Sequence, residues 1–253
     1  MTRRRKLTSI YRNIARTYLR RSPTLVAVAI IVFVPLGLVD ALAAEVDLDA
    51  LDISSGIRLA ALLAALSAVT ATSLLGEVFY SGAVAVSLTH PEDEPPPSLQ
   101  AIARRLNYRR LILIDLIYVA LVLVGFLAFI VPGILFFVWF GLSGPVVEIE
   151  DQTIRGALGR SWELVRSNFW VVFFVLVPVE VVGDVLAEGV ASLIHDWLGH
   201  SLFAGWLAES LSNILLSPVF AIAAVLLTLD LIAEKDGGRK GLDLASTPEA
   251  ATA

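Results

Sequence analysis

Long apolar segments separated by short polar gaps dominate the chain. Apolar residues are concentrated at residues 24–44, 59–88, 111–131, 134–147, 169–186 and 206–232. A helix needs about 20 such residues to cross a hydrocarbon core of roughly 30 Å. We therefore interpret the pattern as six transmembrane helices, of which the fourth is short and the second is long. With 57% hydrophobic residues, the chain also has more apolar surface than a soluble domain of 253 residues can bury.

The basic residues are distributed unevenly over the gaps between these segments. Of the 19 Lys and Arg, eight precede the first segment, four separate the second from the third, three separate the fourth from the fifth, and three follow the sixth. Only Arg58 lies in one of the other gaps, which are acidic or nearly uncharged. Cytoplasmic loops are enriched in Lys and Arg, so we predict an inner or plasma membrane protein with both termini in the cytoplasm. The net charge of −5 hides this separation and does not indicate nucleic-acid binding.

A short amphipathic segment precedes three of the six predicted spans. Each begins with a hydroxyl residue and an aliphatic residue and continues to an Arg seven positions after the first: Ser9-Ile10…Arg16, Ser98-Leu99…Arg105 and Thr153-Ile154…Arg160. The hydroxyl residue can cap a helix, and the apolar residues that follow share one helix face. We predict three cytoplasmic elbow helices at the membrane interface, each followed by a hairpin of two spans. Their Arg16, Arg105 and Arg160 would bind anionic lipid headgroups. The alternative is three unrelated polar flanks of membrane spans.

We expect a single membrane domain over residues 1–236. Within it, the Pro132-Gly133 pair is the expected turn between the third and fourth spans, and residues 90–97, HPEDEPPP, form a linker because proline breaks helices. The tail 237–253 has little to bury and is predicted to be disordered. The basic N-terminus, the first apolar segment and Ala41-Leu42-Ala43 together also resemble a cleavable secretory signal, although the long patterned leader favours a retained span.

Small residues form a stripe along the second predicted span. Positions separated by four are occupied by Ala60, Ala64, Ala68, Thr72 and Gly76. Small side chains allow helix backbones to approach closely inside a membrane. We therefore predict that this span lies at the centre of the bundle.

Acidic residues inside the predicted spans are the candidate functional residues. A charge at the centre of a membrane helix costs about 2.5–3.5 kcal/mol on insertion scales, so Glu77, Asp115, Glu180 and Asp184 need a reason to be there. The spans contain no Lys or Arg to pair with them. They must be protonated, solvated in a cavity or bridged by a cation. The competing interpretation is that residues 179–198 form an amphipathic helix in the outer interface, with the acids facing water.

Motifs for catalysis are incomplete. The chain has no Cys, and its two neighbouring histidines, His195 and His200, lack the spacing of a helical metal pair. Gly141-Leu142-Ser143-Gly144 matches the G-x-S-G of rhomboid proteases, but the sixth span contains no His to act as base. No glycine-rich phosphate loop is present. We therefore expect no enzymatic activity, no cofactor and no metal site.

Residues 131–170 resemble a bacterial membrane-protein family. The resemblance is to the membrane domain fused to some glycerophosphodiester phosphodiesterases and to its stand-alone relatives. The residues that carry it are Pro132-Gly133, Pro145-Val146-Val147, Glu150, Ala157, Arg160-Ser161-Trp162 and Asn168. Residues 136–140 depart from the family, because relatives often carry a polar or basic residue there. The resemblance implies a membrane module without the catalytic barrel, which needs a further domain of about 250 residues.

Two functions from different classes remain open. The first is a non-enzymatic, lipid-engaging or scaffolding membrane protein whose partners are membrane lipids, with a preference for anionic ones. The alternative is a proton- or cation-coupled transporter that uses the four intramembrane acids. A cavity that joins these acids would favour transport.

Overall fold

The computed structural model describes residues 3–44, 74, 76–90 and 97–235, and the regular structure in these ranges is entirely helical. The helices are α1 (Arg3–Ala44), α3 (Glu77–Leu88), α4 (Leu99–Arg105), α5 (Tyr108–Ala128), α6 (Ile130–Phe140), α7 (Ser143–Ile149), α8 (Ile154–Leu198) and α9 (Leu202–Lys235). Within these ranges, five helical segments are long and apolar enough to cross a membrane, with α6 and α7 counted together. The chain is therefore an all-α protein with the helices of a multi-pass membrane protein.

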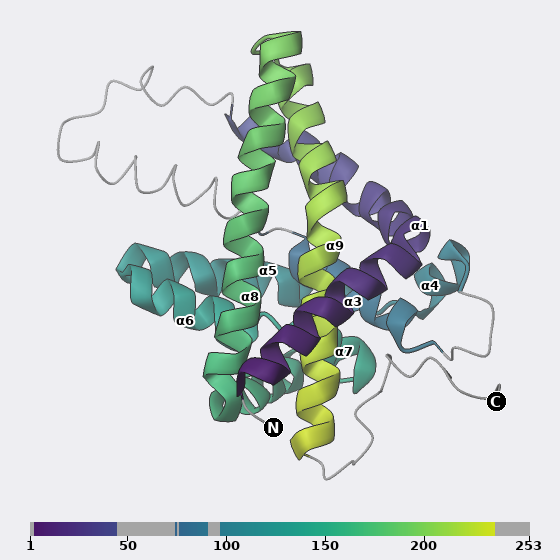
Figure 1. The fold of residues 1–253 in the computed structure, drawn as a ribbon, viewed down its shortest axis with the longest axis vertical. Helices are drawn as coiled ribbons and strands as arrows, with labels where there is room; N and C mark the ends of the chain where they lie inside the picture. The colour runs from purple at the N-terminus through teal and green to yellow at the C-terminus, as the bar shows by residue number, and fades with distance from the viewer. Residues whose placement is uncertain (1–2, 45–73, 75, 91–96, 236–253) are drawn as a thin grey trace.

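Two helical hairpins and one long N-terminal helix build the structure. Helices α8 and α9 form a long antiparallel pair, and the α5–α6 hairpin projects sideways from it (Figure 1). Helix α1 bends along its length and packs against α9 (Figure 1). Pro23 and Pro35 lie inside α1, and an internal proline removes a helix hydrogen bond and favours such a bend.

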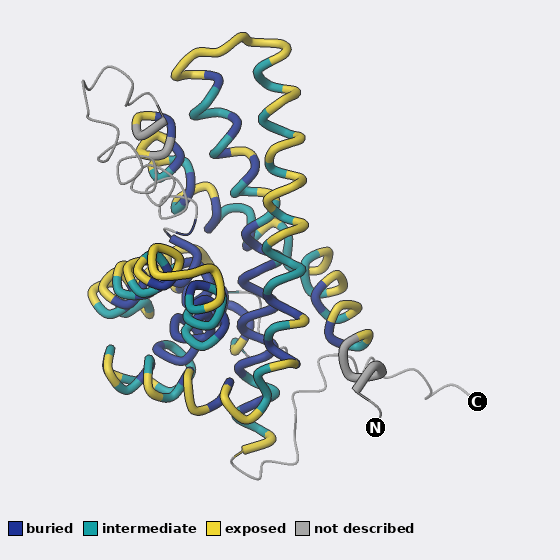
Figure 2. Tube along the Cα trace, turned by 90° about the vertical axis from the view of Figure 1, so that its left-hand side faces the viewer, coloured by how far each residue is buried: buried dark blue, intermediate teal, exposed yellow. Residues whose placement is uncertain are grey.

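The short helix α3 lies at the centre of the core. Every residue of α3 except Phe79 is buried, and α3 contacts α9, α7, α5 and α1. Its Tyr80 hydroxyl donates to the Leu25 carbonyl of α1 at 2.8 Å, and its ring meets Phe33 edge-on. Figure 2 shows the buried residues gathered here, whereas the far end of the α8–α9 hairpin is more exposed.

The described part of the second predicted span agrees with a central position. Gly76 and α3 belong to that span, but most of residues 59–88 and the stripe residues before Gly76 lie outside the described residues. Gly76 has φ 93°, and a Cβ there would clash with a methyl group of Leu36 in α1. The positive φ therefore favours glycine at this position, and any larger residue would also require the Leu36 side chain to move.

Three predicted span boundaries differ from the observed helices. The turn between α5 and α6 lies at the extended residue Phe129, so the prediction of a Pro132-Gly133 turn is wrong. Pro132 instead occupies the first turn of α6, where a missing N–H is tolerated. The fourth span is split into α6 and α7, and α8 continues unbroken from Phe169 to Leu198 rather than ending near residue 186.

The predicted elbow segments are helical, but they pack on the protein. The Ser98 and Thr153 hydroxyls accept from Ala101 N and Gly156 N, so both capping predictions are confirmed. The capping prediction for Ser9 is wrong, because α1 already begins at Arg3. The apolar faces of the three elbow segments contribute buried residues to the core: Ile10, Ile14, Ile102 and Val165. In α8, non-helical backbone at Asn168 separates the elbow from the span.

Candidate functional site

Glu77, the first residue of α3, carries an unpartnered buried oxygen. Its side chain is 5% exposed, and its Oε1 accepts a hydrogen bond of 2.5 Å from the Ser217 hydroxyl of α9. Its Oε2 has no hydrogen-bond partner. Such an oxygen, removed from water, is costly unless a proton or another positive group reaches it. The Glu77 carboxyl group is therefore placed to bind a proton or another positive group from outside the protein.

A cleft between α3, α8 and α9 ends at this carboxyl group. Its volume is about 260 Å³, and five carboxylates line it: Glu77, Glu180, Asp184, Glu188 and Glu209. Ser212, Asn213 and Ser217 add polar groups from α9, and within the described part of the chain no Lys, Arg or His lines the cleft. Because like charges this close repel in a medium of low dielectric constant, the cleft favours protons or cations.

Exposure decreases along the acidic face of α8 towards Glu77. Glu188 and Asp184 are exposed, Glu180 is half-buried, and Glu77 is buried. Glu180, Asp184 and Glu188 are four residues apart and therefore share one helix face. The arrangement is an open cleft with a buried acid at its closed end. Of the two interpretations of residues 179–198, a cleft within a continued helix agrees with this geometry.

Asp115 has a different place from the other three predicted acids. It is not among the residues that line the cleft. Its carboxylate accepts from the backbone N–H groups of Gly76 at 2.7 Å, Val78 at 3.0 Å and Phe79 at 3.3 Å. These are the otherwise unpaired donors at the start of α3. The structure thus brings together Glu77, Glu180 and Asp184 and uses Asp115 to cap a buried helix.

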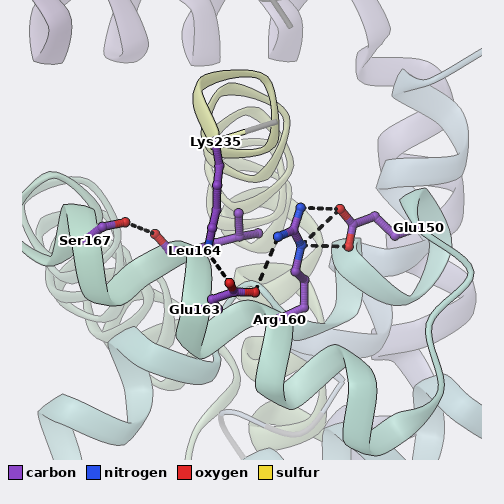
Figure 3. Close-up of polar contacts among 6 residues, drawn as sticks. All are labelled: Glu150, Arg160, Glu163, Leu164, Ser167 and Lys235. Carbon is purple, nitrogen blue, oxygen red and sulfur yellow. Dashed lines mark hydrogen bonds and ion pairs between the residues drawn. The ribbon is translucent and has the colours of Figure 1, made fainter. Parts of the chain in front are cut away.

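The three predicted headgroup-binding arginines also differ among themselves. Arg16 and Arg105 are exposed. Arg160 makes a forked ion pair with Glu150 at 3.0–3.2 Å and a further contact with Glu163 at 3.4 Å (Figure 3). With 16% of its side chain exposed, Arg160 is engaged within the protein and is poorly placed to bind a lipid.

The ion pairs around Arg160 also join the ends of three helices. Glu163 of α8 also pairs with Lys235, the last residue of α9, at 2.5 Å (Figure 3). Glu150 directly follows α7. The network therefore holds the start of α8 to the ends of α7 and α9, at the end of the hairpin opposite its Gly199–Ser201 turn.

The residues considered for catalysis are not assembled into a site. The Ser143 hydroxyl is buried and has no hydrogen-bond partner, so it lacks the adjacent base that a serine nucleophile needs. His195 and His200 stack with ring centroids 4.8 Å apart at the tip of the α8–α9 hairpin. Among the described residues, no cluster of three His, Asp or Glu side chains is arranged to hold a metal ion.

Three neutral polar residues of α9 were not identified from the sequence. Ser212, Asn213 and Ser217 line the cleft together with Glu209, an acid that the sequence suggested for the mouth of such a cleft. Their spacing of three or four residues places them on one face of an otherwise apolar helix, and this polar stripe is the signal that could have identified them.

Comparison of the chain with protein-family models, with curated proteins and with solved structures gives no match.

Proposed function

We propose that this multi-pass membrane protein is a proton- or cation-coupled transporter in which Glu77 is the coupling residue. The observation that carries the proposal is the unpartnered oxygen of Glu77 in a cleft whose described lining residues include five acidic side chains and no basic one. An acid in this position binds a proton or a cation but not both. Exchange of one for the other couples their movement.

The topology that we infer places the cleft on the outer half of the membrane. With both termini in the cytoplasm and six spans, the ion-pair network of Figure 3 lies at the inner surface and the turn at Gly199 lies outside. Asn168 and Glu188 are separated by 20 residues of helix, or about 30 Å. Glu180 then lies in mid-membrane, and the cleft opens outwards through Asp184 and Glu188.

Proton flux in proteoliposomes tests the proposal. The protein is reconstituted with a pH-sensitive dye in the lumen, and Na⁺, K⁺ or tetramethylammonium is added outside. We expect at least one cation to drive a change in luminal pH. The substitution Glu77→Gln should slow it about tenfold or more, because one charge-assisted contact is lost.

The matched control is Asp196→Asn, an acid-to-amide change of an exposed residue of α8 that does not line the cleft. This variant should retain the flux of the wild-type protein. An absence of cation-driven flux in the wild-type protein, or an equal flux in Glu77→Gln, would refute the transport proposal.

The exposed guanidinium groups of Arg16 and Arg105 support a second candidate, the lipid-engaging function. Each lies on an elbow segment that is predicted to face the inner leaflet. Replacing both with Gln should reduce the preference for anionic over zwitterionic lipid in a native lipid-binding measurement. An unchanged preference would remove this candidate.

A further inference from the structure

A second, apolar cleft adjoins the acidic one. Its volume is about 340 Å³, and its lining residues include Tyr11 of α1, Val182 and Leu186 of α8, and Val219 of α9. The two clefts share Val179, Gly183 and Leu216, which lie along the contact between α8 and α9. The volume of the apolar cleft lies within the roughly 300–1,000 Å³ of small-molecule sites, and that of the acidic cleft lies just below this range.

The helical period places the two clefts on either side of this contact. On α8 the acids are at positions 180, 184 and 188, whereas the apolar residues are at positions 178, 182 and 186. An offset of two residues corresponds to about 200° around a helix, so the two sets face in nearly opposite directions. Only the residues between the sets, at the α8–α9 contact, can belong to both clefts.

Gly183 leaves this contact open. A Cβ placed on Gly183 would meet no atom within 4 Å. Val182 and Leu186 are exposed beside it, on the apolar side. The apolar surface, the space at Gly183 and the acidic cleft thus follow one another. The acidic cleft contains the unpartnered Glu77 oxygen.

We propose that the ligand of this site is an amphiphilic organic cation. Its charged group occupies the acidic cleft at Glu77, and its apolar part passes Gly183 into the apolar cleft. Charge complementarity selects the cation, because the described residues that line this cleft include several carboxylates and no Lys, Arg or His. The apolar cleft selects the hydrophobic part, because Val182, Leu186 and Val219 exclude polar groups. This inference rests on the proposed function and assigns its substrate class.

Binding of two related cations tests the inference. Octyltrimethylammonium and tetramethylammonium carry the same headgroup and differ only in the apolar chain. Calorimetric titration of the protein in nanodiscs, corrected with empty nanodiscs for partition into lipid, should give about tenfold or more tighter binding of the octyl compound. Glu77→Gln should weaken the binding of both compounds.

The decisive variant is Gly183→Leu, which fills the gap between the clefts. It should abolish the advantage of the octyl compound, so that this variant binds octyltrimethylammonium no more tightly than tetramethylammonium. The control is Gly189→Leu on the same helix, where a Cβ also meets no atom within 4 Å but which lines neither cleft. This control should bind both compounds as the wild-type protein does.

The possible failures are distinguishable. Equal binding of the two compounds by the wild-type protein would overturn the amphiphile inference and leave cation transport intact. The same holds if Gly183→Leu retains the octyl advantage, or if Gly189→Leu loses it equally. Failure of the wild-type protein to bind either compound would overturn this inference, whereas the proposed function is overturned only if Na⁺ and K⁺ also drive no proton flux.

Discussion

At the residue scale, two opposite charges stabilise the buried helix α3. The Asp115 carboxylate accepts from three N–H groups at its start, and the Arg21 guanidinium donates to the Ser87 carbonyl at its end, at 2.6 Å. A helix has a partial positive charge at its N-terminus and a partial negative charge at its C-terminus. A helix of 12 residues is too short to be stable alone, so these contacts and the surrounding core hold it in place.

The substitution Asp115→Asn should therefore destabilise the protein. The amide nitrogen would face backbone N–H groups and leave at least one of them unpaired, at a cost of about 1–3 kcal/mol. Thermal unfolding in detergent, followed by tryptophan fluorescence, measures the loss. Asp196→Asn on the exposed hairpin tip is the control and should unfold as the wild-type protein does. Equal stability of the two variants would contradict the capping role.

The role of Asp115 could not be derived from its position in the sequence. Its apolar surroundings identify it as an acid that needs a partner, and this much was predicted. The partner is the start of a helix 36–39 residues away, which only the folded chain brings within hydrogen-bond distance. The Glu77–Ser217 hydrogen bond joins residues that are 140 positions apart, so it could not be derived from the sequence either.

At the element scale, ion pairs hold one end of the long α8–α9 hairpin, whereas the acidic cleft lies towards the other end. The ion pairs of Arg160, Glu163 and Lys235 join α7, α8 and α9 beside the kink at Asn168. Towards the tip, the same two helices are lined by acids and by the gap at Gly183. The ion pairs thus hold the two helices together at one end, and the acidic cleft lies towards the other end.

Breaking the Arg160–Glu150 ion pair should lower the free energy of unfolding. Because both side chains are less than 20% exposed, Arg160→Gln leaves Glu150 without its partner and should cost about 2 kcal/mol. The double variant Arg160→Gln/Glu150→Gln should recover part of this loss, because it removes the uncompensated charge as well. Thermal unfolding measures these two variants and the single variant Glu150→Gln, and exposed Arg155→Gln is the control. Strictly additive losses would show that the pair is not coupled.

At the scale of the whole molecule, the length of the hairpin exceeds the thickness of a membrane. From Asn168 to Leu198, α8 spans 30 residues, or about 45 Å, against a hydrocarbon core of roughly 30 Å. If Asn168 lies at the inner surface, the tip with His195 and His200 projects well beyond the outer one. The mouth of the acidic cleft then lies near the outer surface, where water-soluble cations can enter.

Cysteine labelling tests this orientation, since the chain has no Cys of its own. We expect His200→Cys at the hairpin tip to react with a membrane-impermeant maleimide in intact cells. Gln100→Cys on α4 should react only after the membrane is permeabilised. Both positions are exposed, so accessibility within the protein does not limit either reaction. Reaction of Gln100→Cys in intact cells would overturn the proposed topology.

The sequence by itself determined the helical class, the apolar helices, two of the three caps and the presence of acids without basic partners. These features depend on composition and on neighbours a few residues away, which hydropathy and capping chemistry describe directly. Tertiary structure alone decided that Glu77, Glu180 and Asp184 share a cleft, that Asp115 caps α3, and that Arg160 pairs with Glu150. Each of these depends on which helix faces cross in space, and long-range contacts of this kind are not encoded in any local pattern.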